Sequence, residues 1–426
     1  MSVVVQKFGG TSVADAEKFR ASARHVLAAR ALGHRVVVVV SAMGHETDRL
    51  VDLAHTVTPS PDRREMDQLL ATGEQVSVAM MALTLQTLGC AARSLTGQQA
   101  GIVTDAAHQR ATVVSMDPTA LRGLLEGGVV PVVAGFQGVE RGGDVTTLGR
   151  GGSDTTAVAV AARLKDVYGS ATCEIYKDVD GVYTADPRVV PGARRLEAVT
   201  YDEMLEAAAL GSQVIHPRAV EMAKRFGVPV RVLHSQEAAG RVDAGTLLVG
   251  ETEPAMETRV VSSVVVKRNV ARVSLRGLPN RAGVQSAVFG PVAQARLPVD
   301  DIIQEDDGPG TINLTFTLDR GDVGEVRAIA QRAGAEYGAQ AVRIDTGLST
   351  VSIVGEGMRH ATGVAARMFR ALAEEGVPIE NITTSEIRVS IVVAEGDAER
   401  AARCLHGAFE LGTIGALANS PQGLSD

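Results

Sequence analysis

Residues that could bind a charged substrate gather in one glycine-rich stretch, residues 149–154. The stretch reads Gly-Arg-Gly-Gly-Ser-Asp, so it carries a cation (Arg150), a hydroxyl (Ser153) and a carboxylate (Asp154). A glycine turn that opens a helix leaves backbone N–H groups unpaired, and such groups suit an anion. The glycines alone would fit a plain strand-to-helix turn equally well. The added Arg-Ser-Asp set favours a site for a small zwitterion or a phosphate.

A second unusual residue is Lys7, which follows the apolar run 3–5 and precedes Gly9 and Gly10. An unpaired lysine at the end of a buried strand costs several kcal/mol. Either the strand end is solvated or the lysine points at a bound phosphate, and we favour the second interpretation. If a carboxylate is the nucleophile it is already ionised, so no general base is needed. Lys7, the glycine amides and Mg²⁺ would then position and neutralise a transferred phosphoryl group.

A substrate amino acid needs one cation and one carboxylate from the protein. Arg150 offers bidentate geometry for an α-carboxylate. Glu74 could accept the ammonium group, although a glutamate in a helix-like stretch is more often solvated. The polar loop 177–188 carries aspartates spaced too irregularly for an EF-hand, which could face a nucleotide or a metal or simply form turns. We expect His45 and His216 to be surface and loop histidines.

The composition limits the class of protein. The chain has 426 residues, 45% of them hydrophobic and 22% charged, which predicts two or three globular domains with an ample core. A net charge of −8 and an aromatic content of 3% argue against nucleic acid as a partner. No apolar stretch reaches the roughly 18 residues of a membrane span. The three cysteines lack metal-ligand spacing and fit reduced thiols, so we expect a cytoplasmic protein.

A parallel α/β sheet should position the charged residues. The apolar runs 3–5 and 36–40, joined by a helical stretch that ends near residue 31, form a βαβ unit. Because the carboxyl ends of parallel strands meet at one edge of a sheet, Lys7, Gly9, Gly10 and Ser41 should converge there.

The first helix should start in a capping-box-like arrangement of Ser12 with Asp15. A polar, proline-broken run at 251–258 marks the end of a first domain, 1–250. Within that domain we expect further helices at 64–89, 155–164, 201–210 and up to 226, and further strands at 129–134, 173–176 and 228–233.

The rest of the chain contains an internal repeat of low identity. Residues 273–277 match 351–355, and residues 312–318 match 387–393. Each copy reads strand, helix, strand, strand, helix, which is the ferredoxin-like βαββαβ pattern. We therefore expect two modules, 262–345 and 346–422. Their role is either regulation of the first domain or structural packing alone.

Several motifs together resemble the aspartate kinase family over essentially the whole chain. They are Lys7-Phe8-Gly9-Gly10-Thr11-Ser12, Val40-Ser41-Ala42-Met43, Gly73-Glu74, residues 146–154 and residues 178–188. The resemblance implies an α/β, three-layer amino-acid-kinase domain with a mainly parallel sheet, followed by two ferredoxin-like (ACT) modules. It also implies transfer of the ATP γ-phosphoryl group to the β-carboxylate of L-aspartate, the first step towards lysine, threonine and methionine or a related product.

The resemblance also implies roles for single residues. Lys7 would stabilise the phosphoryl transition state and Asp154 would organise the catalytic cations. Glu74 would hold the substrate ammonium. The residues that would bind the α-carboxylate and position the substrate are Thr47, Arg150, Gly151, Gly152 and Ser153. ATP, with Mg²⁺, would contact Lys7, Phe8, Gly9, Gly10, Ser41, Lys177, Asp178, Tyr183, Asp186 and Arg188.

The sequence departs from the family at three places. Gln213 stands where many relatives carry a lysine that reaches ATP phosphates, which affects the expected nucleotide affinity. Asn280 stands where relatives show the aspartate that resembles an effector-ammonium ligand, and the second module lacks the usual proline at 360–363. Loss of a charge-assisted hydrogen bond costs roughly 1–2 kcal/mol, about tenfold in affinity, so we expect weakened feedback by lysine and threonine. The candidate effector residues are Asn280, Ala282, Gln304 and Asn381.

Two other functions stay open at this point. One is another amino-acid kinase of the same fold, acting on glutamate or an N-acylated relative; an N-acyl substrate would leave Glu74 idle. The other is a non-catalytic ACT-based amino-acid sensor. Open sheet edges in such modules favour a homodimer or larger oligomer. A separate regulatory chain that starts near Met256 is also conceivable.

Overall fold

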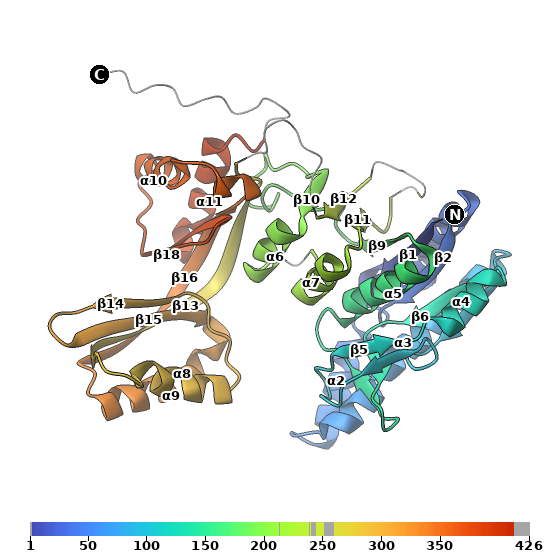
Figure 1. Ribbon diagram of the computed structural model, residues 1–426, viewed down its shortest axis with the longest axis horizontal. Coiled ribbons are helices and arrows are strands. Elements are labelled where there is room, and N and C mark those ends of the chain that lie inside the picture. Colours follow the sequence, from blue (N-terminus) through green and yellow to red (C-terminus); the bar gives the residue numbers. More distant parts are fainter. Residues whose placement is uncertain (1, 213, 238, 240–243, 251–259, 413–426) are drawn as a thin grey trace. The chain divides into compact units, whose positions relative to one another are not determined.

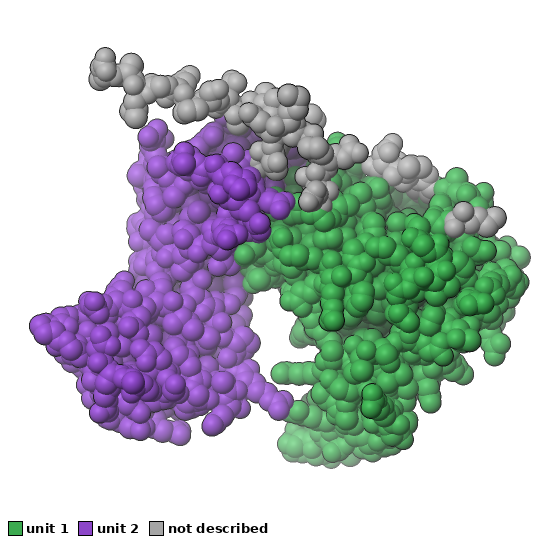
Figure 2. Space-filling view, in the orientation of Figure 1, with its two compact units in different colours: residues 1–183, 195–256 green, residues 184–194, 257–426 purple. Residues whose placement is uncertain are grey.

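The computed structural model describes residues 2–212, 214–237, 239, 244–250 and 260–412. The chain forms two compact units, which are described separately below (Figure 2). The first unit contains residues 1–183 and 195–256, and the second contains residues 184–194 and 257–426. The short segment 184–194 therefore groups with the C-terminal part of the chain, which the sequence pattern did not predict.

An eight-stranded sheet forms the centre of the first unit, with β1 between β2 and β9. All its pairs are parallel except β11 with β12, so β12 and its parallel neighbour β10 run against the rest. Long runs of valine give strands that are buried on both faces, as in other parallel sheets. In spatial order the strands are β10 (Ala198–Thr200), β12 (Thr246–Val249), β11 (Val230–His234), β9 (Ala171–Lys177), β1 (Val3–Phe8), β2 (Arg35–Val40), β6 (Val130–Ala134) and β3 (Ala92–Leu95).

Helices cover both faces of this sheet, which confirms the predicted three-layer domain. Helices α1 (Ala16–Ala31) and α3 (Arg63–Thr87) share one core with alternate residues of β1, β2 and β6. Helix α5 (Gly152–Tyr168) packs against β1 and β9 on the other face (Figure 1). The remaining helices of this unit are α2 (Glu46–Val57), α4 (Thr119–Glu126), α6 (Tyr201–Ala209) and α7 (Pro217–Phe226).

The start of α1 differs from the prediction. The carboxylate of Asp15 caps the helix by accepting a hydrogen bond from the Lys18 N–H at 2.9 Å. Ser12 lies before the cap, in a short 3-10 turn, η1 (Gly10–Val13), and its hydroxyl is buried. Ser12 is therefore no part of a capping box, because the chain needs the extra turn to pass from β1 into the helix.

A second, four-stranded sheet lies next to the glycine-rich stretch and was not predicted from the sequence. Its last strand ends two residues before Gly149, so this sheet delivers the chain to the turn. The strands are too short for alternation to be recognised in the sequence. In spatial order they are β5 (Val113–Met116), β4 (Ile102–Thr104), β7 (Gln137–Val139) and β8 (Val145–Thr147).

The second unit is built on one antiparallel sheet of six strands, with two pairs of helices (Figure 1). Its content matches the expected two ferredoxin-like modules. In spatial order the strands are β14 (Ile302–Asp306), β15 (Thr311–Asp319), β13 (Ser263–Pro279), β16 (Ala341–Val354), β18 (Arg388–Ala394) and β17 (Asn381–Thr384). The helices are α8 (Val284–Gln294), α9 (Val323–Tyr337), α10 (Val364–Glu374) and α11 (Ala398–Ala408).

The two modules have separate cores but share their two longest strands. The C-terminal half of β13 packs with α8 and α9 in the first core, whereas Val264 at its other end packs with α10 and α11 in the second. The second module therefore takes a strand segment from the stretch of sequence assigned to the first module. The limits 1–250, 262–345 and 346–422 stay a prediction, to which the structure adds this shared strand.

Segment 184–194 also contributes to the second core. Ala185, Val189 and Val190 are buried there among residues of β13, β16 and α11. The backbone of Thr184 accepts a hydrogen bond from the Val264 N–H at 2.7 Å, and the guanidinium of Arg403 donates to the Val189 carbonyl at 2.8 Å. A loop from the first part of the sequence is thus a structural element of the second module.

No helix in the described ranges is long and apolar enough to cross a membrane.

Candidate active site

Two lysines hold one buried aspartate at the carboxyl ends of the central strands. Lys7 and Phe8 are consecutive residues of β1, so their side chains lie on opposite faces of the sheet. Phe8 points into the core shared with α1 and α3, and Lys7 points toward α5. The Lys7 Nζ lies 2.6 Å from the Asp154 Oδ1, and the Nζ of Lys177, the last residue of β9, lies 3.3 Å from its Oδ2. We call these three residues the Lys-Asp-Lys trio.

Asp154 is ionised although it is almost fully buried. Burial would raise the pKa of Asp154, but the charges of Lys7 and Lys177 and the hydrogen bonds from both outweigh it and bring the pKa to about 2. Burial lowers the pKa of Lys177, and its pairing with Asp154 opposes that shift. Two cations against one anion leave an excess positive charge, which is complementary to a phosphate.

Asp154 stands in the first turn of α5, where the helix dipole favours a negative charge. The turn before it requires glycine at Gly151, whose φ of 67° lies in the left-handed region. A methyl group at this position would also lie 2.1 Å from the Cγ of His216. The backbone of the turn and the imidazole of His216 are therefore in direct contact.

His216 was predicted to be a loop histidine and proves to be part of this site's wall. It caps α7 immediately before Pro217, its Nδ1 is buried without a partner among the described residues, and burial lowers its pKa. The imidazole is therefore neutral at physiological pH. The only sequence signal for it is a histidine directly before a helix-starting proline, which is too common to identify a site residue.

Glu74 is buried in α3, so its reading as a solvated helix residue is wrong. One carboxylate oxygen accepts a hydrogen bond from the Ala42 N–H at 2.9 Å, and the other is buried with no partner in the described part of the chain. Burial raises the pKa of Glu74 to about 8, although backbone N–H groups and the charge of Lys7 act to lower it. A buried carboxylate with one unpaired oxygen is suited to receive a cationic ligand.

The other predicted substrate residues lie around the same turn. Ser153 is nearly buried in the first turn of α5, beside Gly152. Arg150 is exposed, and none of the described residues bonds to its guanidinium. Thr47 lies in the first turn of α2 and is half-buried. Their roles toward a substrate stay predictions.

The predicted nucleotide residues near β1 lie together where the strand ends, and the Gly9 N–H donates to the Tyr176 carbonyl at 3.3 Å. The side chain of Phe8 stacks on Tyr176 with ring centroids 4.8 Å apart and belongs to the core shared with α1 and α3. The Ser41 N–H donates to the Phe8 carbonyl at 3.1 Å, which brings β1 and β2 to the same edge, as predicted. Gly9 lies beneath the ammonium of Lys7, and Gly10 begins the next turn.

The later nucleotide candidates belong to both units. Asp178 is exposed directly after β9, and the Tyr183 hydroxyl donates to the Asp180 carboxylate at 2.9 Å. Asp186 and Arg188 lie in segment 184–194 of the second unit, where they form an ion pair of 2.7 Å with each other that lowers the pKa of Asp186. The expected departure at Gln213 falls outside the described residues.

Comparisons with known proteins agree with this geometry. A family model described as the amino acid kinase family matches residues 2–234, and an ACT domain model matches residues 351–409. The aspartokinase of Pseudomonas aeruginosa is 48% identical over 96% of this chain and 98% of its own. The chain belongs to the aspartate kinase family.

Solved structures of this family share the fold. Aspartokinase III of Escherichia coli with aspartate and ADP (R-state) is 28% identical, covers 96% of this chain and 99% of its own, and has a TM-score of 0.76. The same enzyme with lysine and aspartate (T-state) is 27% identical over the same shares, with a TM-score of 0.75. The roles of the Lys-Asp-Lys trio and Glu74 toward phosphate and ammonium stay predictions.

The candidate effector residues of this aspartate kinase lie in different modules. Asn280 and Ala282 are exposed in the loop between β13 and α8, and Gln304 in β14 accepts a hydrogen bond from the Gln285 amide of α8 at 2.8 Å. Asn381 begins β17 in the second module, where its side chain accepts a hydrogen bond from the Ile382 N–H. The first three can serve one site, and Asn381 belongs elsewhere in the unit.

Proposed function

We propose that this chain transfers the γ-phosphoryl group of ATP to the β-carboxylate of L-aspartate, forming 4-phospho-L-aspartate. The observation that carries the proposal is the buried Lys-Asp-Lys trio at the carboxyl ends of β1 and β9. Full-length relatives named aspartokinase support the same reaction, as does the related enzyme solved with aspartate and ADP. The product would enter the synthesis of lysine, threonine and methionine or a related compound.

The reaction needs no general base, and the trio supplies the charges that it does need. The β-carboxylate of aspartate is ionised at neutral pH and can attack the γ-phosphorus directly. Lys7 and Lys177 stabilise the negative charge on the phosphoryl oxygens, and Asp154 holds their two ammonium groups in place. Because these charges are fixed before the substrates arrive, little reorganisation is needed in the transition state.

Recognition of aspartate is shared by three elements. The free oxygen of Glu74 in α3 accepts the α-ammonium group, and Arg150 with Ser153 at the start of α5 binds the α-carboxylate. Thr47 contributes from α2. This arrangement leaves the β-carboxylate as the end of the substrate that meets the trio.

The residues fit a nucleotide that brings its own metal. The glycine turns and the N-terminus of α5 suit phosphates. In the described residues no three His, Cys, Asp or Glu side chains gather as metal ligands. Mg²⁺ is commonly bound through substrate phosphates with few protein ligands, and here it would neutralise phosphate charge.

An ATP-dependent aspartate hydroxamate assay tests the reaction. Hydroxamate should form with L-aspartate. N-acetyl-aspartate should react poorly because it has no ammonium group for Glu74. Glutamate should react poorly because its side-chain carboxylate lies farther from its ammonium group. Preference for an N-acylated acid would identify the chain as another amino-acid kinase of the same fold. No phosphorylation of any of these acids, together with retained amino-acid binding, would support a sensor instead.

For regulation we propose that lysine, threonine or both bind the ACT modules, with reduced affinity because Asn280 is uncharged. The related enzyme solved with lysine supports an amino-acid effector. We propose a homodimer or larger assembly through these modules, whose edge strands β14 and β17 are unpaired on one side within the described chain. The free thiols of Cys90, Cys173 and Cys404 support a cytoplasmic location.

A further inference from the structure

A second carboxylate of α3, Asp67, is buried and bonded to Thr147, two residues before Gly149. It lies about two helical turns before Glu74, on the same side of the helix. Its exposed fraction is 0%, although a carboxylate buried without donors would be strongly destabilising. Its partners therefore indicate why it is there.

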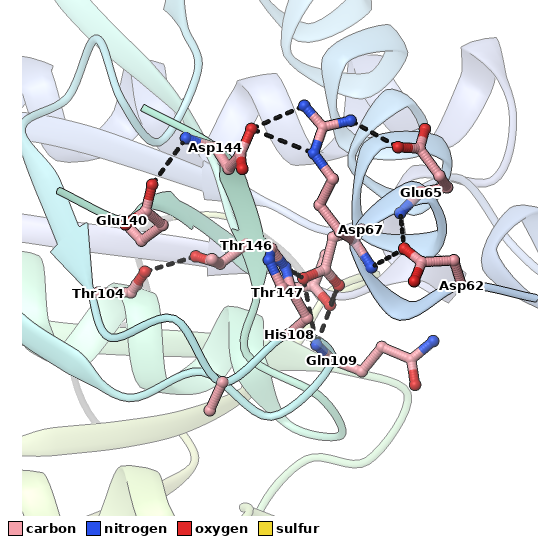
Figure 3. Close-up of polar contacts among 12 residues, drawn as sticks. Asp62, Glu65, Asp67, Thr104, His108, Gln109, Glu140, Asp144, Thr146 and Thr147 are labelled. Atoms are coloured by element: carbon pink, nitrogen blue, oxygen red, sulfur yellow. Dashed lines mark hydrogen bonds and ion pairs between the residues drawn. The ribbon is translucent and has the colours of Figure 1, made fainter. Parts of the chain in front are cut away.

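All the partners of Asp67 come from two distant segments (Figure 3). The Nδ1 of His108 lies 2.7 Å from its Oδ2, and the Gln109 N–H lies 3.1 Å from each carboxylate oxygen. The Thr147 hydroxyl donates a short hydrogen bond to its Oδ1. One carboxylate thus joins α3, the loop 105–112 and the end of β8.

These partners directly support the turn that carries Arg150. Thr147 is the last residue of β8, and its carbonyl accepts a hydrogen bond from the Ala111 N–H at 3.0 Å. Gln109 adopts a φ of 67°, a strained conformation for a residue other than glycine. Its carbonyl oxygen would lie only 2.8 Å from a methyl group on Gly149, whose own φ is 75°.

The guanidinium of Arg218 closes the same arrangement from α7. It donates to the Leu148 carbonyl at 2.6 Å and to the Ala111 carbonyl at 2.9 Å. The chain from Thr147 to Gly149 is therefore fixed on both sides, and Asp67 is the only connection among these bonds that leads back to α3. Helix α3 in turn carries Glu74.

We propose that Asp67 is a positioning residue that sets the distance between the two groups recognising aspartate. Through Thr147 and Gln109 it fixes the turn of Arg150 and Ser153 relative to Glu74. Because Asp67 is fully buried, this role runs through its protein partners and needs no contact with the substrate or the nucleotide. This inference rests on the proposed function, because it assigns Glu74 and Arg150 to the two ends of the substrate's amino-acid group.

Asp67→Asn in the full-length chain tests the proposal with little change in shape. The asparagine keeps one acceptor for the Gln109 N–H but loses the second carboxylate oxygen and the negative charge. We expect KM for aspartate to rise at least about tenfold, the effect of losing one charge-assisted hydrogen bond, with kcat within about threefold and KM for ATP unchanged. A loss of folding stability alone would not produce that split.

Asp144→Asn is the matched control. Asp144 precedes β8 at its other end and also binds α3, through the guanidinium of Arg64 at 2.7 Å, but this ion pair is exposed and its loss should leave KM for aspartate unchanged. Thr147→Val, which removes one hydroxyl, should raise KM for aspartate in the same direction. In the double variant with Asp67→Asn, Thr147→Val should raise KM for aspartate by a smaller factor than it does alone, because both substitutions remove the same contact.

Three results would overturn the proposal. They are an unchanged aspartate KM in Asp67→Asn, an equal loss in kcat and in affinity for both substrates, or full additivity with Thr147→Val. If Asp67→Asn does not fold, Thr147→Val alone decides, since an unchanged aspartate KM in that variant contradicts the role. Wild-type turnover of aspartate is measured first, so absence of activity there would instead reject the proposed function.

Discussion

The Nζ of Lys7 and the Oδ1 of Asp154 lie 2.6 Å apart, and both side chains are almost fully buried. They come from β1 and from the first turn of α5, so strand and helix meet through an ion pair. The second lysine, Lys177, makes this more than a structural pair, because the trio keeps a net positive charge. An uncompensated buried charge is expensive unless a ligand of opposite sign binds there.

Lys7→Ala should lower kcat at least about 10²-fold, the scale of losing one transition-state donor. The steady-state hydroxamate assay at saturating aspartate and ATP measures this effect. Lys18→Ala serves as the control and should be near wild type, because this half-buried lysine of α1 only approaches Asp15, at 3.9 Å. Near-normal turnover of Lys7→Ala would remove Lys7 from the mechanism.

Asp154→Asn should damage both stability and activity. It leaves Lys7 and Lys177 buried beside each other without their shared anion, and breaking a buried ion pair from one side costs about 3–5 kcal/mol. Urea unfolding monitored by circular dichroism should show the loss, which ATP should partly restore because its phosphates replace the missing negative charge. A variant as stable as wild type would mean that the trio is effectively solvated.

The pH dependence of kcat/KM for aspartate should report Glu74. In the free enzyme the pKa of Glu74 is raised by burial to about 8, and binding of the substrate ammonium requires the ionised carboxylate. Below about pH 8, kcat/KM should therefore rise about tenfold per pH unit and then level off. Glu74→Gln should give a low and flat profile; an unchanged rise in that variant would assign the ionisation to another group.

As the pH rises, Glu74→Gln should become more stable relative to the wild type. A carboxyl group whose pKa is raised in the folded state contributes stability that is lost between its unfolded pKa of 4.5 and its folded pKa of about 8. The wild type should lose about 1.4 kcal/mol per pH unit in that window relative to the variant. Urea titrations across this pH range measure the difference, and a constant gap between the two proteins would contradict the shift.

Asn280→Asp should strengthen feedback inhibition. The wild-type chain should respond weakly to lysine and threonine, and the restored carboxylate should raise effector affinity about tenfold by making a charge-assisted hydrogen bond. Activity titrations with each amino acid, and with both, provide the measurement. Strong inhibition of the wild type at sub-millimolar lysine plus threonine would show that Asn280 does not limit the response.

The sequence was informative where one local rule decides the outcome. Lys7 at the end of a buried strand and the glycines before Asp154 signal a site, because few alternatives accommodate a lysine or such a turn there. The long parallel strands follow from runs of valine. The four strands of the small sheet are too short to show alternation, so the element that leads into the turn was missed.

Other features depend on contacts that a linear pattern does not contain. Asp67 resembles any polar residue of an amphipathic helix, and its burial is explained only by His108, Gln109 and Thr147, which are 41 to 80 residues away in sequence. His216 becomes a site residue only because Gly151 lacks a side chain.

Segment 184–194 has a consequence for how this protein can be divided at the level of the gene. A polypeptide that starts near Met256, which lies outside the described residues, would lack Ala185, Val189 and Val190 of its own second core. Recombination at the 251–259 stretch between related genes would likewise pair one parent's loop with the other parent's hydrophobic core. The residues that build the second core are therefore discontinuous in the gene, and only an exchange that carries the loop keeps both parts of this core from one parent.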